Sequence, residues 1–189
     1  EAIVEFADEQ AKVTMSITCD LSRKLLDLLH ADELDIVIAL LAREKNPYLV
    51  RSWDERPIWA VAKDFPVNKS MAVPLVTHPE GCEYRRRMTA ALRAEGRDWR
   101  AAYTTPDIGS LQRAVSAGMG VTALTRKTVL PDMRILSSRE GFPAMEPIHI
   151  GLFYKHQRLS GAGLMLVDSL IARMDEAAEP ALPKASAAR

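Results

Sequence analysis

This chain has few cysteines and no net charge, and both features limit what it can be. Its 189 residues include only two cysteines, Cys19 and Cys82. Two are too few for a disulfide framework and cannot hold a structural zinc ion by themselves. The 25 basic side chains are balanced by 25 acidic ones, so the formal net charge is zero. Because a self-sufficient nucleic-acid-binding protein needs a basic surface, we expect no specific DNA binding by this chain alone.

Long apolar segments are also absent. The longest apolar runs, such as residues 36–42, are far shorter than the roughly 20 residues of a transmembrane helix. The chain does not open with a basic stretch followed by an apolar one, as an export signal does. We therefore expect no membrane contact and a cytoplasmic location. Residues 1–10 already show helical spacing of apolar side chains, and we expect further chain upstream of them.

The motifs of common enzymes and cofactor sites are missing as well. The turn at residues 118–120 is too short for a phosphate-binding loop and follows a predicted helix instead of opening one. The four histidines are scattered instead of being paired at metal-ligand spacing. Ser110 lacks the Gly-x-Ser-x-Gly context of a hydrolase nucleophile. We predict no catalytic activity, no metal ion and no cofactor.

What the chain does have is the composition of a packed α/β protein, with 48% apolar and 26% charged residues. Apolar spacing of period two, and short apolar runs, predict strands at residues 12–18, 36–41, 49–52, 58–62, 73–76, 99–103, 121–124 and 148–154. Helical spacing predicts helices at residues 1–10, 23–30, 83–96, 107–117 and 159–174. The early strand–helix–strand order predicts parallel pairing of 12–18 with 36–41, the latter buried on both faces. Residues 63–72 are expected to be a connector, and residues 179–189 a disordered tail.

Polar loops follow several of these strands and form the candidate ligand site. In a parallel sheet the carboxyl ends of the strands meet at one edge, where ligands bind beside the first turns of helices. The candidate residues are Thr18, Cys19, Asp20, Thr77, His78, Thr104, Thr105 and Asp107, with Thr125 at the edge of the site. Their hydroxyl groups and the helix-start amides suit a small polar or anionic ligand, towards which His78 would supply a pH-dependent charge.

Simpler interpretations of the same residues stay open. Asp20 or Ser22, and Asp107 or Ser110, are also suited to cap the helices that follow them. The two cysteines would form a redox switch only if their sulfurs lay within disulfide reach and one had a low pKa. The run of arginines at residues 85–87 suits phosphate binding, but on a helix it spreads around the circumference, which favours a solvated face.

Several segments together resemble the effector-binding domain of LysR-type transcriptional regulators. Residues 34–39 resemble the family's "L-D-hydrophobic-A-hydrophobic" strand, and residues 110–124 resemble its "VaaGlGvalLp" segment. Residues 79–85 are similar to the start of the family's second lobe, and residues 56–59 resemble the subgroup that includes the motility repressor LrhA. The likeness runs in the family's order from about residue 1 to residue 176. Thr125 departs from it, since many members have proline there.

The resemblance implies an α/β fold with two lobes of the type II periplasmic-binding-protein architecture and a ligand cleft between them. It places lobe one at residues 1–73 plus 147–178 and lobe two at residues 74–146. The chain would cross between them within 63–72 and again within 141–147. The family's DNA-binding helix-turn-helix, and the first strand of this domain, would precede Glu1.

We therefore expect the effector-binding and oligomerisation domain of a LysR-type regulator, which senses a small molecule and reaches DNA only through a helix-turn-helix outside this sequence. A solute-binding protein of a transport system uses the same fold and is the alternative. The resemblance also implies a homodimer or a higher homo-oligomer, in which lobe one of each copy packs against lobe two of its mate. In lobe one Ile3, Phe6 and the strand at 12–18 would take part, unless Ile3 and Phe6 pack only within their own lobe. In lobe two the matching surface would be the helix at 83–96 beside the strand at 99–103.

Overall fold

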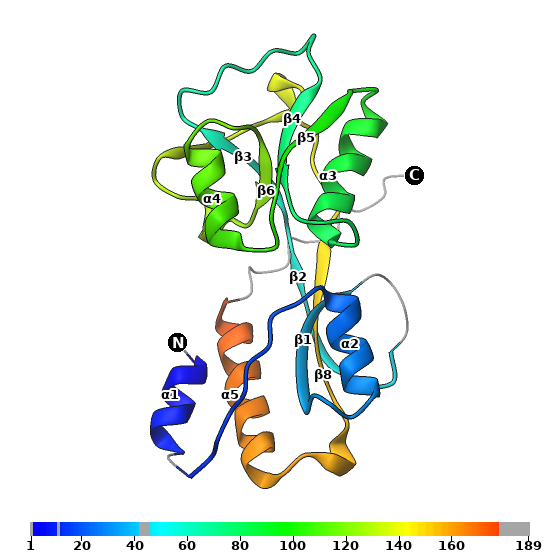
Figure 1. The fold of residues 1–189 in the computed structure, drawn as a ribbon, viewed down its shortest axis with the longest axis vertical. Coiled ribbons are helices and arrows are strands. Elements are labelled where there is room, and N and C mark those ends of the chain that lie inside the picture. The colour runs from blue at the N-terminus through cyan, green and yellow to red at the C-terminus, as the bar shows by residue number, and fades with distance from the viewer. Residues whose placement is uncertain (1, 11, 42–45, 178–189) are drawn as a thin grey trace, which may run out of the picture.

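The computed structural model describes residues 2–10, 12–41 and 46–177, which form two lobes joined by extended passages of chain (Figure 1). Lobe one contains α1 (Ala2–Glu9), α2 (Ser22–His30), β1 (Ile36–Leu41), β2 (Leu49–Glu55), β8 (Ile148–Tyr154) and α5 (Gly161–Ala177). Lobe two contains β3 (Ile58–Ala62), β4 (Val73–Thr77), α3 (Glu83–Ala94), β5 (Trp99–Thr104), α4 (Ile108–Ser116), β6 (Thr122–Leu124) and β7 (Met133–Ile135). Short 3₁₀ helices lie at Arg126–Thr128 (η1), Ser138–Glu140 (η2) and His156–Arg158 (η3).

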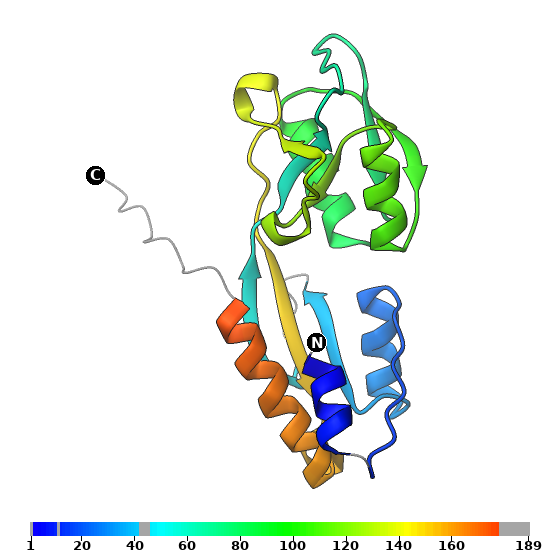
Figure 2. The same cartoon turned by 90° about the vertical axis from the view of Figure 1, so that its left-hand side faces the viewer.

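Lobe one is a three-stranded sheet with a helix on each face. The strand order is β1-β8-β2, and both pairs are antiparallel. Because neighbouring residues of a strand point to opposite faces, Leu152 of β8 packs with Val167 of α5, whereas Phe153 packs with Leu29 of α2. Figure 2 shows α5 and α2 on the two sides of this sheet. The helices thus bury both faces of the central strand β8.

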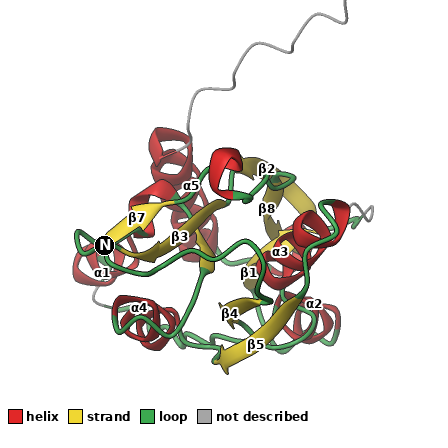
Figure 3. Ribbon diagram, turned by 90° about the horizontal axis from the view of Figure 1, so that it is seen from above, coloured by secondary structure: helices red, strands yellow, loops and turns green. Residues whose placement is uncertain are grey.

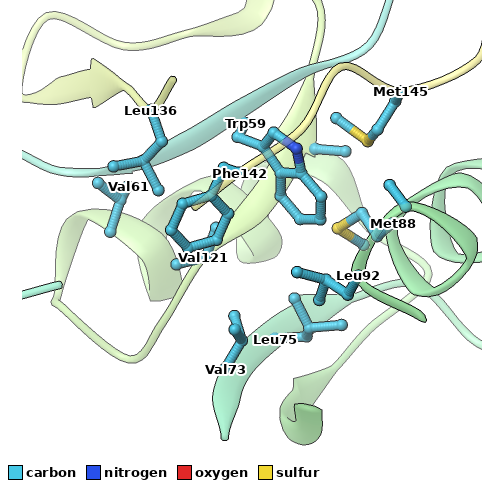
Figure 4. Close-up of a cluster of buried hydrophobic side chains, with 12 residues drawn as sticks. Trp59, Val61, Val73, Leu75, Met88, Leu92, Val121, Leu136, Phe142 and Met145 are labelled. Carbon is cyan, nitrogen blue, oxygen red and sulfur yellow. The ribbon is translucent and has the colours of Figure 1, made fainter. Parts of the chain in front are cut away.

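Lobe two is a mixed sheet in the order β5-β4-β6-β3-β7. β4 and β5 are parallel, β3 is antiparallel to β6 and β7, and a parallel bridge between Leu75 and Val121 joins the two groups. One face packs on α3 through a cluster that includes Trp59, Leu75 and Leu92 (Figure 4). The other face packs on α4 through Leu111 and other buried side chains. Seen from above, α3 and α4 lie on either side of the sheet (Figure 3).

The chain first crosses between the lobes at a different place from the one expected. Residues 58–62 were expected in lobe one, but as β3 they pair with β6 and β7. The first passage is therefore the short link Arg56-Pro57 between β2 and β3, and the second runs from η2 to β8. The connector at residues 63–72 joins two strands of lobe two. Its polar, proline-containing composition is that of any surface loop and does not reveal which strands it links.

The expected strand over residues 12–18 is not formed. The segment pairs with none of the described strands, and Ile17 is 65% exposed. Alternating side chains show only that a segment faces two environments, whereas a strand also needs a neighbour with unpaired N–H and C=O groups. The predicted parallel pairing in lobe one is therefore wrong: β1 pairs antiparallel with β8. β1 also lies at the edge of its sheet, and its Ile38 is 38% exposed instead of buried.

The helix caps were predicted correctly at one helix and wrongly at another. Asp107 caps α4, because its Oδ1 accepts a hydrogen bond from the backbone N–H of Ser110 at 2.6 Å. At α2 the N-cap position belongs to Leu21, and no side chain caps the helix. Ser22 Oγ instead accepts from the N–H of Leu40 at 2.9 Å and ties α2 to β1. The tail at residues 179–189 lies outside the described residues, and no described helix is long and apolar enough to span a membrane.

Candidate functional site

The lobe-two candidates lie where its parallel strands end. Thr77 is the last residue of β4, Thr104 is the last of β5, and Thr125 directly follows β6. Because β4 runs parallel to both β5 and β6, these ends meet at one edge of the sheet. The end of β5 points towards lobe one, on the side where α2 lies (Figure 2). The structure thus brings the loops after β4 and β5 together, as the sequence predicted.

Hydrogen bonds hold these two loops as one unit. The N–H of Thr105 donates to the carbonyl oxygen of Thr77 at 3.0 Å. Nδ1 of His78 donates to the carbonyl oxygen of Thr105, also at 3.0 Å. The N–H of Asp107 donates to Thr105 Oγ1 at 3.2 Å. Since Thr77 and Thr105 are buried, they shape the site mainly through the backbone that they position.

The protonation of His78 follows from its surroundings. Burial lowers the pKa of His78, although the hydrogen bond to Thr105 and the nearby Asp107 carboxylate act in the opposite direction. The imidazole is therefore neutral near pH 7, because an ordinary histidine already loses its proton near a pH of about 6.5. A carbonyl oxygen can only accept, so the proton is on Nδ1 and Nε2 is an acceptor. His78 gains positive charge only in more acidic solution than an exposed histidine does.

Arg85, from the run of arginines that the helical spacing assigned to a solvated face, lies beside these loops. Arg85 is only 17% exposed; its Nη1 donates to the carbonyl oxygen of His78 at 3.4 Å and its Nη2 to Glu80 Oε1 at 3.2 Å. Its guanidinium also lies over the ring of Trp99. Position 85 falls in the first turn of α3, where side chains point back towards the preceding loop, and that placement was available from the sequence. The other two arginines of the run pair with Glu83.

The lobe-one candidates face this edge without bonding to it. Leu21, which follows Thr18, Cys19 and Asp20, approaches the loop after β4: a Cβ on Gly81 would lie 4.0 Å from Leu21 Cδ1. Among the described residues, no hydrogen bond joins these three candidates to lobe two. Asp20 pairs with Lys24, and that contact and the N–H of Leu21 lower the pKa of its carboxyl group.

Thr125 is engaged locally, and neither cysteine is in a disulfide. Thr125 is the N-cap residue of η1, and its Oγ1 is hydrogen-bonded to Thr128 Oγ1 at 3.1 Å, so the hydroxyl group is occupied locally. Cys19 and Cys82 are both free. Burial raises the pKa of the Cys82 thiol, which disfavours the reactive thiolate that a redox switch needs. In the described part of the chain, no group of three or more His, Cys, Asp or Glu side chains could hold a metal ion.

Comparisons with known proteins agree on one family. The family model described as LysR substrate binding domain matches residues 1–175. The HTH-type transcriptional regulator PecT of Dickeya dadantii (strain 3937) is 24% identical over 134 residues, which are 71% of this chain and 42% of PecT. The chain therefore spans less than half of that relative.

Solved structures share the fold. The apo regulatory domain of HypT from Salmonella typhimurium has a TM-score of 0.72 at 12% identity, covering 93% of this chain and 90% of that domain. The regulatory domain of CcmR from Synechocystis PCC6803, in complex with 2-PG, has a TM-score of 0.65 at 15% identity, covering 91% and 88%. The expected α/β architecture of the type II periplasmic-binding-protein kind is confirmed.

Proposed function

Since the chain belongs to the LysR substrate-binding-domain family, we propose that it is the effector-binding domain of a transcriptional regulator. The observation that carries this proposal is the family match over residues 1–175. The site geometry supports it, because the loops after β4 and β5 are bonded together and face the loop before α2. The alternative of a transport protein is not favoured, since PecT is a regulator by name.

We propose that the effector is a small anion bound between the loops at residues 18–21, 77–82 and 104–107. Arg85 supplies the positive charge that His78 lacks near neutral pH. The N-terminus of α3 lies at the same edge and favours an anion, whereas the first turn of α4 is already capped by Asp107. Ligand binding that favours one arrangement of the lobes would shift the population towards it, which is the change a DNA-binding part would detect. No catalytic step is proposed for these residues.

Replacing Arg85 is expected to weaken effector binding. A panel of small carboxylates and phosphates is screened by thermal shift, since a ligand at a hundred times its Kd adds about 2.7 kcal/mol of stability. For the ligand that binds, Arg85→Gln should raise Kd about tenfold or more, because one charge-assisted hydrogen bond is lost. Arg93→Gln, at the far end of the same helix and exposed, is the matched control and should leave Kd unchanged. Equal Kd values for the two variants would contradict the assigned site.

We also propose that the chain forms a homodimer, through the lobe-two elements that the sequence suggested but without Ile3 and Phe6 of lobe one. Phe6 is 4% exposed, and Ile3 packs on the cluster under α5, so both side chains are used within their own lobe. In lobe two, β5 is the outer strand of the described sheet and α3 packs beside it, which leaves an open edge for a mate. Light scattering at micromolar concentration should give twice the 21.0 kDa chain mass. A strictly monomeric mass at every concentration would exclude the dimer.

The remaining parts of the proposal concern the whole regulator. We propose that DNA is contacted through a helix-turn-helix outside this sequence and that the protein acts in the cytoplasm. The likeness of residues 56–59 to the LrhA-like subgroup supports placing the chain there. That segment holds the first passage between the lobes and Trp59, which packs in the lobe-two core.

A further inference from the structure

A cavity of about 340 Å³ lies in lobe two, away from the loops that face lobe one. Residues 65–68 and 71–72 of the connector cover it, and the first residues of β4, Val73 and Pro74, line its floor. Thr77, at the effector edge, lies four residues beyond Val73 and three beyond Pro74 on the same strand, which is about 10–13 Å at the rise of a β-strand. The cavity is therefore separate from the proposed effector site. Its volume lies at the lower end of the range, about 300–1,000 Å³, that is typical of small-molecule sites.

The walls of the cavity are mostly apolar. Phe65, Val67, Met71 and Phe142 contribute side chains to it. Phe142 is itself held in the core by an edge contact with Trp59, with ring centroids 5.2 Å apart (Figure 4). Met71, in contrast, is 66% exposed and sits at the rim. A ligand with an apolar body would cover this surface and remove it from water.

Two arginines give the cavity a positive charge. Arg97 Nη1 donates to the carbonyl oxygen of Gly141 at 2.6 Å, and its guanidinium carbon lies 4.7 Å from the centre of the Phe142 ring. The buried Nε of Arg97 has no hydrogen-bond partner among the described residues. The guanidinium of Arg100 on β5 has neither a hydrogen bond nor an ion pair with any described residue. No acidic side chain is among the described residues that line the cavity.

We propose that this cavity binds an amphipathic monocarboxylate, with its apolar body among Phe65, Val67 and Phe142 and its carboxylate at Arg100 and Arg97. The planar guanidinium group matches the geometry of a carboxylate. The negative charge of the ligand would balance the positive charges of Arg97 and Arg100. Inorganic phosphate would satisfy the arginines but would leave the apolar walls uncovered. The site requires no contact with the effector loops, so it stands or falls independently of the effector site proposed above.

Phenylacetate and octanoate are the probes, and NMR of the 15N-labelled chain is the readout. We expect saturable shifts of the backbone amides at residues 65–73, 97–100 and 141–142, with none at residues 77–82 or 104–107. Phenylacetamide has the same shape without the charge and should bind about tenfold more weakly, as expected for loss of a charge-assisted hydrogen bond. Failure of both acids to bind at millimolar concentration, equal binding of the amide, or shifts confined to the effector loops would each overturn the proposal.

Variants test separately whether binding depends on the arginine charge and on the free volume of the cavity. Arg100→Gln should raise the Kd of phenylacetate about tenfold without affecting folding, because the side chain is exposed and has no described partner. Arg126→Gln, exposed on η1 of the same lobe, is the matched control and should leave Kd unchanged. Ala72→Phe adds a ring at the rim of the cavity and should abolish binding. An unchanged Kd in both R100Q and A72F would place the ligand elsewhere.

Discussion

Replacing Gly120 by alanine is expected to destabilise lobe two by about 3 kcal/mol or more, as for a strongly overpacked core position. A Cβ at this position would lie 2.2 Å from the carbonyl oxygen of Pro74 and 2.9 Å from its carbonyl carbon. Both are backbone atoms of β4, so no side chain can rotate away to make room. Glycine is thus required here by the closeness of two chain segments.

The clash between this Cβ and Pro74 would disturb the hydrogen bonds that join the two halves of the lobe-two sheet. The N–H of Val121 donates to the carbonyl oxygen of Pro74 at 2.8 Å, and the N–H of Val76 donates to the carbonyl oxygen of Val121 at 2.9 Å. Moving Gly120 away from β4 would lengthen both. Buried backbone groups that lose their partners add about 1–3 kcal/mol each to the cost of the substitution.

Gly118→Ala is the matched control for this prediction. Gly118 has a φ of +78°, and a Cβ there would meet nothing within 4 Å. Its substitution should cost only about 1–2 kcal/mol, the penalty for an L-residue in the left-handed region. Urea unfolding followed by circular dichroism compares the two free energies of unfolding. Equal losses for G118A and G120A would show that the close approach of Gly120 to Pro74 does not limit stability.

Trp59→Ala is expected to cost about 3–5 kcal/mol, in the range for a large aromatic side chain removed from a core. Trp59 is 2% exposed and packs among the side chains between the sheet and α3 (Figure 4). Its Nε1 donates to the carbonyl oxygen of Pro143 at 2.7 Å. Trp59 closely follows the first passage between the lobes, and Pro143 lies on the second. The indole therefore ties the two passages together at the base of lobe two.

The hydrogen bond can be separated from the packing. Trp59→Phe keeps most of the apolar volume but leaves the Pro143 carbonyl without its donor, and should cost about 1–3 kcal/mol. Trp99→Phe is the matched control, because the Trp99 indole makes no hydrogen bond with any described residue and is only partly buried. It should cost less than W59F in the same urea experiment. A larger loss for W99F would mean that the bond to Pro143 contributes little.

Much of this chain could be predicted from short stretches of sequence. The order β4-α3-β5-α4-β6 was expected to within a few residues, because each element has its own apolar spacing and its own turn residues. The cap at Asp107 needs only the Ser110 amide three residues later. The clustering of Thr77, His78 and Thr105 also followed, since the ends of neighbouring parallel strands meet at one edge. The family assignment likewise depended on short segments, whose residues can be compared with those of the family without knowing how the chain folds.

Tertiary structure alone decided which strands pair and what surrounds each side chain. β3 has the pattern of a buried strand in either lobe, and only pairing with β6 and β7 placed it. Residues 12–18 have a strand pattern but pair with no described strand. The burial of Arg85, the lowered pKa of His78 and the cavity beneath residues 65–72 arise from atoms distant in the chain. The physical reason is common to all of these: local spacing determines how a segment presents its side chains, whereas pairing, burial and desolvation depend on the partners that folding brings to it.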